Sequence, residues 1–364
     1  MGEGILINGI SSIKQLKRYI SIPKKEEIVL EKVVKIHPIE ITKYYLSLID
    51  KNDKNDPIKK MIVPSVEEMD LSGDYDTSGE SENTKTVGLQ HKYPQTALML
   101  LTNRCAAYCR YCFRKRLVGL QTKEILKRVN DATDYIKKHK EIDNVLISGG
   151  DSLIQPTEVI EKVIKLLFSI PHIRYIRFGS KIPVVFPDRI IKDKKLLEVF
   201  KKYSKNKQIY IITHFNHPKE ITKKSTEAVS KFIKSGVIVK NQTVLLKGVN
   251  DNPEILSKLM NKLTSIGVNP YYIFQCRPVK RVKNHFQVTL YDGIKIVEEA
   301  KKQLSGLGKR FKYMMSHKTG KIEIIGIMGD YMYFKYHQAK NQANVGKLFK
   351  KRINKEIGWL DNLR

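Results

Sequence analysis

Three cysteines in one short run have the spacing needed to hold an iron–sulfur cluster. Cys105, Cys109 and Cys112 lie in the segment LTNRCAAYCRYCFRKR, and the chain contains one further cysteine, Cys276. Cysteine thiolates are the usual ligands of such clusters, and a cluster of four irons needs four of them for full ligation. Three thiolates therefore leave one iron open to bind a small molecule and transfer an electron to it. A zinc site and three unrelated buried thiols are the alternatives.

The spacing of four and then three residues resembles that of the radical S-adenosylmethionine (SAM) enzymes. The aromatic Tyr111 stands directly before the third cysteine, which agrees with this resemblance. The resemblance implies a [4Fe–4S] cluster whose open iron binds and cleaves SAM. Four cysteines, three of them clustered, also fit a reducing compartment in which thiolates remain available.

Composition indicates a large, soluble and basic chain. Its 364 residues can bury a sizeable core. No apolar run approaches the ~20 residues that span a bilayer, and the N-terminus lacks a secretory signal. We therefore expect a cytoplasmic protein. The net charge of +30 suggests nucleic-acid binding. The lysines, however, are spread along the whole chain and interrupted by acids, which argues against a direct function in nucleic-acid binding.

Patterning divides the chain into four segments. Residues 1–65 are predicted to be helical, because apolar positions recur three and four residues apart. Residues 66–90 form a polar linker, acidic and rich in Ser and Gly, which is expected to be exposed and to order only against a partner or ligand. Residues 91–309 carry the predicted catalytic core. Residues 310–364 contain the apolar run KIEIIGIMG and then basic sequence, which predict a cap or an extra strand with basic terminal helices.

The core segment predicts an α/β fold built as a partial (β/α)6 TIM-like barrel. Six short apolar runs alternate with amphipathic, lysine-rich stretches, as parallel strands and their crossover helices require: ALMLL, NVLISGG, YIRFGS, QIYIITH, VIVKNQTVLL and NPYYIFQC. Active sites of such barrels lie at the C-terminal ends of the strands. The cysteine run follows the first strand directly. The N-terminal helices are expected to cover the mouth of the barrel.

Polar residues follow several of these strands, where an ordinary core would not require them. They are Ser148, Gly149, Gly150 and Asp151 after the second strand, Ser180 and Lys181 after the third, His214 and His217 after the fourth, and Asn241 and Gln242 within the fifth. Glycines let the backbone approach a ligand closely, although a tight turn is the plainer explanation for a lone GGD. Their shared position favours a ligand site.

Long stretches of the chain resemble the lysine 2,3-aminomutase family of radical SAM enzymes. The likeness runs through LQHKYP, LTNRCAAYCRYCFRKR, VLISGGD, IRFGSKIPVVFPDRI, THFNHPKEIT, NQTVLLKGVND and PYYIFQC, over roughly residues 50 to 325. The family implies a second cofactor, pyridoxal 5′-phosphate (PLP), held on a lysine near the chain's end. Lys321, in FKYMMSHKTGK, matches that lysine, and Gly320 before it allows close backbone approach.

The resemblance also implies roles for individual residues. Residues matched to the PLP site are Lys92, Tyr93 and His214; those matched to the SAM site are Tyr111, Ser148, Gly149, Gly150, Asp151, Ser180 and Gln242. Arg114 matches the arginine that receives the substrate's α-carboxylate, a pairing that suits a guanidinium fork. On the phosphate side Lys92 replaces an arginine, and Thr96 stands where another basic group is expected.

Departures from the family pattern concern the substrate and a zinc site. Lysine-specific members hold the distant ammonium with two aspartates, and here Arg277 and Met314 stand in their places. A buried arginine would repel a lysine side chain, so an acidic or neutral amino acid such as glutamate is expected instead. The alternative is that Arg277 points to solvent. Asn252 replaces one zinc ligand of the family and the others are missing, so zinc is not expected.

The implied reaction is the migration of an α-amino group to the β-carbon of a small amino acid. A radical made from SAM removes a hydrogen from the β-carbon, the nitrogen migrates while held by PLP, and the hydrogen is returned. The implied partners are an electron donor such as ferredoxin or flavodoxin and further copies of the chain in a homo-oligomer. Because the zinc ligands are missing, the packing of its subunits is expected to differ from that of the family. The alternative is a radical SAM enzyme that acts on a peptide, protein or RNA, with the basic surface as its docking face.

Overall fold

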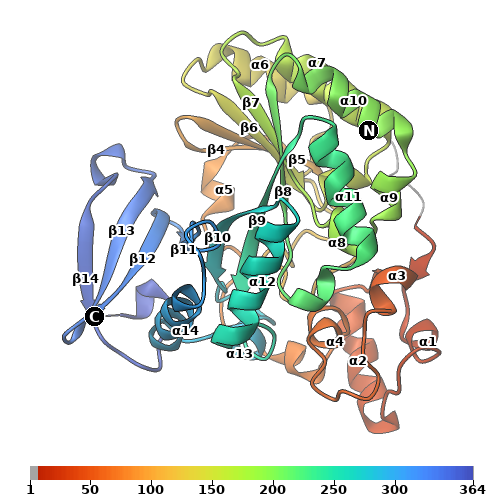
Figure 1. Cartoon of the computed structure of the whole chain (residues 1–364), viewed down its shortest axis with the longest axis vertical. Coiled ribbons are helices and arrows are strands. Elements are labelled where there is room, and N and C mark those ends of the chain that lie inside the picture. The colour runs from red at the N-terminus through yellow and green to blue at the C-terminus, as the bar shows by residue number, and fades with distance from the viewer. Residues whose placement is uncertain (1–6, 364) are drawn as a thin grey trace.

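The N-terminal region is helical, as predicted. The structure is a computed structural model that describes residues 7–363. Four helices and a small antiparallel sheet make up this region: β1 (Gly9–Ile10), α1 (Ile13–Leu16), α2 (Lys24–Ile36), β2 (Ile41–Thr42), α3 (Lys43–Leu46) and α4 (Pro57–Ile62). They lie together at one end of the molecule, drawn in red in Figure 1. Ile13, Leu16 and Ile58 bury their side chains fully, which ties the region to the main core.

One continuous sheet of twelve strands, in sequence order, forms the rest of the fold. Its strands are β3 (Thr84–Thr86), β4 (Leu89–Tyr93), β5 (Thr96–Thr102), β6 (Asn144–Gly149), β7 (Tyr175–Gly179), β8 (Gln208–Thr213), β9 (Ile238–Leu245), β10 (Asn269–Gln275), β11 (Lys312–His317), β12 (Gly320–Met328), β13 (Tyr331–Ala339) and β14 (Leu348–Arg352). Strands β5 to β11 are parallel, and the strands beyond them on either edge are antiparallel. The six predicted strands are β5 to β10, and β11 adds a seventh beyond the expected boundary at residue 309.

Helices cover the outer face of the sheet (Figure 1). They are α6 (Val129–Lys138), α7 (Thr157–Phe168), α8 (Ile182–Val185), α9 (Asp188–Ile191), α10 (Lys194–Ser204), α11 (Lys223–Lys234), α12 (Pro253–Ser265), α13 (Lys283–Phe286) and α14 (Leu290–Lys302). The short helix α5 (Glu80–Asn83) is not part of this layer and packs beside β4. In α7, Ile160, Val163, Ile164 and Leu167 are fully buried, and their spacing of three and four puts them on one face. The apolar stripe therefore packs on the sheet while the lysines face outward. Within residues 7–363, none of the helices has the length and apolarity that crossing a membrane would require.

The prediction of basic terminal helices is wrong. After β11 the chain forms the antiparallel strands β12, β13 and β14, drawn in blue in Figure 1, joined or followed only by the short turns η4 (Gln342–Asn344) and η5 (Leu360–Asn362). In β14 the residues alternate between exposed and half-buried positions, with Phe349 stacked on Phe334 of β13. Lys350 and Arg352 therefore lie on the exposed side of this edge strand, while Lys351 lies on the half-buried side with Phe349.

The expectation of an exposed linker is wrong at two of its acids, Glu68 and Glu80, which are buried against cations of the cysteine loop, while Glu67, Asp74 and Glu82 are exposed as expected. Glu68, in the turn η1 (Val66–Met69), is fully buried and contacts Arg110 at 2.6 Å and Lys115 at 2.5 Å. Further along, Ser78, Glu80 and Asn83 are buried as well. Acidic side chains that read as solvated in the sequence are thus the counter-charges that let basic residues enter the interior.

We predict that Glu68→Gln destabilises the protein by about 3–5 kcal/mol, because it leaves two buried cations unpaired. Burial opposes ionisation of Glu68, but Arg110 and Lys115 outweigh it and lower the carboxyl's pKa to about 2. A carboxyl group whose pKa is lower in the folded than in the unfolded protein stabilises the fold at any pH above its unfolded pKa, here about 4.5. This stabilisation is lost as the pH falls from about 4.5 to about 2.

Denaturant unfolding at neutral pH measures this effect, with the exposed neighbour Glu67→Gln as the matched control. An equal loss in both variants would contradict the assignment of Glu68 as the counter-charge.

Candidate active site

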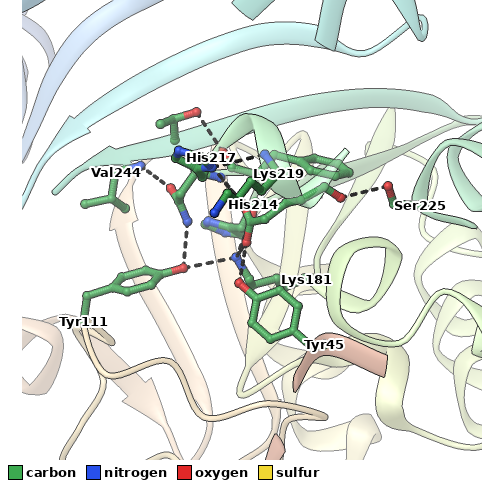
Figure 2. Close-up of polar contacts among 12 residues, drawn as sticks. Tyr45, Tyr111, Lys181, His214, His217, Lys219, Ser225 and Val244 are labelled. Atoms are coloured by element: carbon green, nitrogen blue, oxygen red, sulfur yellow. Dashed lines mark hydrogen bonds and ion pairs between the residues drawn. The ribbon is translucent and has the colours of Figure 1, made fainter. Parts of the chain in front are cut away.

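A cavity of about 600 Å³ opens at the C-terminal ends of the parallel strands and extends into the barrel. All sixteen residues predicted for the site lie in its wall: Lys92, Tyr93, Cys105, Cys109, Tyr111, Cys112, Arg114, Ser148, Gly149, Gly150, Asp151, Ser180, His214, Gln242, Arg277 and Lys321. The volume suits a small substrate with cofactors. The described part of the wall begins at Ser78 in the linker, and Tyr45 of α3 packs behind it against Lys181 (Figure 2), so cover by the N-terminal helices stays a prediction.

The three cysteines of the loop after β5 face this cavity. Among the described residues they form no disulfide, and the backbone N–H of Arg114 donates to Cys112 Sγ at 3.4 Å. Burial raises the pKa of all three thiols, to about 11 for Cys112. Metal coordination, which deprotonates a thiol outright, would hold them as thiolates. Three thiols in the wall of one cavity, none of them in a disulfide among residues 7–363, therefore fit an iron–sulfur cluster.

The turn after β6 brings backbone close to the cysteine loop. Gly149 has a φ of +114°, and a side chain there would collide with the backbone oxygen of Thr102, as one at Gly150 would with that of Arg104. Asp151 accepts hydrogen bonds from the backbone N–H groups of Lys181 at 2.6 Å and Leu153 at 3.1 Å. Burial raises the Asp151 pKa to about 6. The glycines are thus required for the close approach of this turn to the end of β5 and the start of the cysteine loop.

Lys321 lies at the opposite wall of the cavity, on β12. Gly320 before it packs against the Gln338 backbone of β13, where a Cβ would not fit. Burial lowers the pKa of the Lys321 ammonium to about 7, and nearby cations, Arg177 first among them, lower it further. The Nζ atom stands 4.8 Å from the centre of the Tyr272 ring. An amine that is half deprotonated at neutral pH suits a lysine that must attack an aldehyde.

Other polar residues of the cavity wall add positive charge, and two of them, Lys92 and Arg177, lie close enough to lower the pKa of Lys321. Lys92 Nζ donates to the backbone oxygens of Ser78 at 3.0 Å and His317 at 2.6 Å, and burial lowers its pKa to about 8. Burial also lowers the pKa of His214 to about 4, so its imidazole is neutral. Arg177, which the sequence reasoning missed, lines the same cavity, and its buried Nε has no acceptor among residues 7–363. This orphaned cationic donor fits an anionic group such as a phosphate.

Arg114 is held by a partner that sequence reasoning also missed. Its Nε and Nη2 atoms lie 3.1 Å and 3.0 Å from Glu80 Oε1, and its Nη1 donates to Ser148 Oγ and Gly149 O, each at 3.1 Å. Glu80 also pairs with Arg116 at 2.8 Å. A substrate carboxylate at Arg114 would therefore share the guanidinium with Glu80. The sequence contains one indication of this pairing: the acidic residue Glu80 lies in the linker, and a loop with the basic residues Arg114 and Arg116 follows.

Arg277 faces the cavity, so the alternative that it points to solvent is wrong. Its guanidinium carbon lies 4.1 Å from the centre of the Phe113 ring, and its Nη1 donates to Ser78 Oγ at 2.7 Å. Burial lowers the pKa of Arg277 to about 10, which still leaves it protonated at neutral pH. Met314 is fully buried in β11 and lies outside the described cavity wall.

Comparison with known proteins agrees with this geometry. The sequence profile described as the Radical SAM superfamily matches residues 99–259. A protein of Aquifex aeolicus (strain VF5) named "Putative L-lysine 2,3-aminomutase" is 44% identical over 352 residues, which cover 96% of this chain and 94% of the relative. The chain belongs to the lysine 2,3-aminomutase family. The predicted radical SAM fold and enzyme class are thereby confirmed.

Two further members of this family differ in the substrate that their names give. The "L-lysine 2,3-aminomutase" of Clostridium subterminale is 40% identical over 302 residues, which cover 82% of this chain and 71% of the relative. The "Glutamate 2,3-aminomutase" of Clostridioides difficile (strain 630) is 38% identical over 304 residues, which cover 83% and 71%. Radical SAM enzymes use a [4Fe–4S] cluster and SAM, and lysine 2,3-aminomutases also use PLP. Because the chain is almost equally identical to both relatives, sequence identity does not distinguish lysine from glutamate as the substrate. The substrate must be inferred from the residues of the site.

Asn252, at the position of a family zinc ligand, has a structural role here. Its Oδ1 accepts a hydrogen bond from the backbone N–H of Ile255 at 3.0 Å and caps the first turn of α12. Asparagine is among the strongest residues at this position, so the residue is explained by helix capping alone.

We predict that Cys105→Ala, Cys109→Ala and Cys112→Ala each lose most of the bound iron after anaerobic reconstitution, because two thiolates hold the cluster poorly. Iron content and visible absorbance measure the loss. Cys276→Ala is the matched control, since Cys276 lines the same cavity outside the cysteine loop. A similar loss of iron in the control would contradict a three-cysteine site.

Proposed function

We propose that this enzyme moves the α-amino group of an acidic amino acid, most simply glutamate, to its β-carbon. The observation that carries the proposal is the position of Arg277, whose protonated guanidinium lines the cavity that also holds the cysteines and Lys321. Its only hydrogen bond to a side chain among the described residues goes from Nη1 to Ser78, which leaves donors for a ligand. A carboxylate is the acceptor that a guanidinium fork matches best.

The charges around Arg277 argue against L-lysine as the substrate. The acid nearest to it in the wall, Glu80, already pairs with Arg114 and Arg116. A second ammonium in this place would lie beside the Arg277 guanidinium without a carboxylate of its own, which costs several kilocalories per mole in a desolvated site. A side-chain carboxylate in the same place would instead be attracted to the Arg277 guanidinium and bind favourably.

The chain's own residues would divide the remaining work by position. When bound, the cluster and SAM supply the hydrogen-abstracting radical, and PLP supplies the group that carries the migrating nitrogen. Lys321 provides a neutral amine for PLP, while Lys92 and Arg177 place positive charge where its phosphate would lie. Arg114 orients the α-carboxylate at the rim, next to the cysteine loop. The enclosing wall, including the linker residues Ser78 and Glu80, excludes water from the reacting atoms.

An external protein must reduce the cluster, and we propose an acidic one-electron donor such as ferredoxin or flavodoxin. The net charge of +30 favours association with an acidic partner through complementary potential.

A screen of single amino acids tests the proposed function. Anaerobically reconstituted enzyme is given glutamate, lysine, arginine, glutamine and alanine separately, with SAM, PLP and dithionite, and the products are resolved by mass spectrometry. We expect β-glutamate as the dominant product. Formation of β-lysine as the dominant product would contradict the role of Arg277, and no β-amino acid from any of the five would contradict the proposed function itself.

We predict that Arg277→Gln lowers kcat/KM for glutamate by about 10²-fold, the loss of a charge-assisted pair of ~3 kcal/mol. Arg174→Gln, which changes an exposed arginine, serves as the control. Activity with glutamine should fall much less than activity with glutamate, because its neutral amide never used the charge. An equal fall for both substrates would mean that Arg277 supports the fold of the site and does not select the substrate.

We predict that Lys321→Ala abolishes the absorbance of lysine-bound PLP, whereas Lys318→Ala, at an exposed position three residues earlier, retains it. Only the neutral amine attacks the aldehyde, and the pKa of Lys321 is lowered to about 7. The rate of PLP attachment should therefore rise from pH 6 to pH 8 and then level off. A rate that still rises steeply above pH 9 would show an unshifted lysine and contradict the site.

A further inference from the structure

Two histidines and a glutamate outside the catalytic cavity bring their metal-binding atoms together. One ligand atom from each of His91, His139 and Glu141 lies within 4.8 Å of the other two. Within this set, His139 Nδ1 and Glu141 Oε1 are 2.9 Å apart. None of the three residues belongs to the wall of the cavity. Two imidazoles and a carboxylate are a ligand set that proteins use to hold Zn²⁺ and related ions.

Three separate positions of the chain supply these side chains. His91 lies in β4 between Gln90 and Lys92, and both of these neighbours line the cavity. Because side chains alternate along a strand, His91 points away from the cavity. His139 caps the C-terminus of α6, and Glu141 follows in the turn before β6. An ion bound by all three would therefore join β4 to the connection between α6 and β6.

The His91 ring has the orientation of a metal ligand. Its Nε2 atom lies 3.0 Å from the backbone oxygen of Pro94, so this nitrogen carries a proton and donates it. In the neutral ring, Nδ1 then has a free lone pair, which faces the hydroxyl group of Tyr135 at 3.1 Å. Histidines that bind a metal through one nitrogen commonly donate the other N–H to a backbone carbonyl or a carboxylate.

Tyr135 also fixes the second histidine. Tyr135 and His139 are four residues apart along α6, and their rings stack with centroids 4.0 Å apart and an interplanar angle of 21°. The rings of His91 and His139 meet edge to face, with centroids 5.7 Å apart. Both imidazoles are thus held by aromatic contacts and hydrogen bonds before any ion arrives.

The spacing of the donor atoms is close to what a tetrahedral ion requires. A Zn²⁺ ion with bonds of about 2.1 Å needs donor atoms about 3.4 Å apart, so shifts of about 1 Å per side chain would close a site that now spans 4.8 Å. The side chains of His139 and Glu141 are 37% and 47% exposed, so an ion can reach them from solvent.

We propose that His91, His139 and Glu141 form a binding site for a divalent transition-metal ion, with Zn²⁺ as the best match. A water molecule or the Tyr135 hydroxyl would complete the tetrahedron. This site shares no residue with the zinc position of the family, where Asn252 stands in this chain.

The proposed ion would support the cavity wall from outside. His91 directly precedes Lys92, and Glu141 lies two residues before Asp143; Lys92 and Asp143 both line the cavity. An ion shared by His91 and Glu141 would thus fasten two segments of the wall to each other. The role is structural, takes no part in the radical reaction, and holds whichever amino acid is the substrate.

A zinc titration of the reconstituted enzyme tests the proposal. In this form the cysteines hold the cluster and do not compete for the added ion. Anaerobic isothermal calorimetry, after free iron has been removed, should show one Zn²⁺ bound per chain. His139→Gln should weaken binding about tenfold or more, since even indirect contacts to a metal site are worth that much. His172→Gln, which changes a half-buried histidine outside the site, is the matched control and should bind Zn²⁺ as the wild type does.

X-ray absorption at the zinc edge then identifies the ligands. Nitrogen and oxygen at about 2.0–2.2 Å are expected, whereas sulfur at about 2.3 Å would assign the zinc to the cysteines. Zn²⁺ should also raise the thermal unfolding midpoint of the wild type but not of Glu141→Gln, a change at an exposed position. Sulfur ligands, the absence of stoichiometric binding, or an unchanged affinity in His139→Gln would overturn the proposal, and an equal rise in the midpoint of Glu141→Gln would do the same.

Discussion

The structure depends on neutralising positive charge inside the barrel. Arg110 and Lys115 enter the interior beside the cysteine loop only because Glu68 meets both, and Arg114 and Arg116 do so because Glu80 meets them. A buried cation without a counter-charge would cost several kilocalories per mole. The acidic linker is therefore part of the active-site wall, and the position of the cysteine loop follows from these pairs.

Two cationic side chains of the cavity, Arg277 and Lys321, have no carboxylate partner among residues 7–363, and the proposed function rests on them. Arg277 has a stacking partner and a neutral hydroxyl acceptor but no carboxylate of its own, and burial, reinforced by the surrounding cations, lowers the pKa of Lys321 to about 7. One cavity thus contains a protonated guanidinium suited to an acidic side chain and a neutral amine suited to an aldehyde.

Local sequence patterns predicted the parallel strands, the cysteine loop and the strand-end residues, because each depends on short-range periodicity or spacing. The errors came from long-range pairing. Leu348–Arg352 is a strand only because it hydrogen-bonds to β13, and its lysines resemble an exposed helix face in isolation. Glu80 and Arg114 are 34 residues apart, and Glu68 and Arg110 are 42 apart, so no local pattern links them. Arg277 was identified by resemblance, but only its three-dimensional setting shows that it faces the cavity.

The central claim is that the cysteines and Lys321 serve one reaction in one cavity. The most direct test is to supply SAM deuterated at its 5′ carbon together with unlabelled glutamate, and to measure deuterium in the amino acid by mass spectrometry. A shared site predicts deuterium in β-glutamate, because hydrogen returns to the substrate from the same 5′ carbon that removed it. β-Glutamate formed without deuterium, under conditions where SAM is cleaved, would contradict the account.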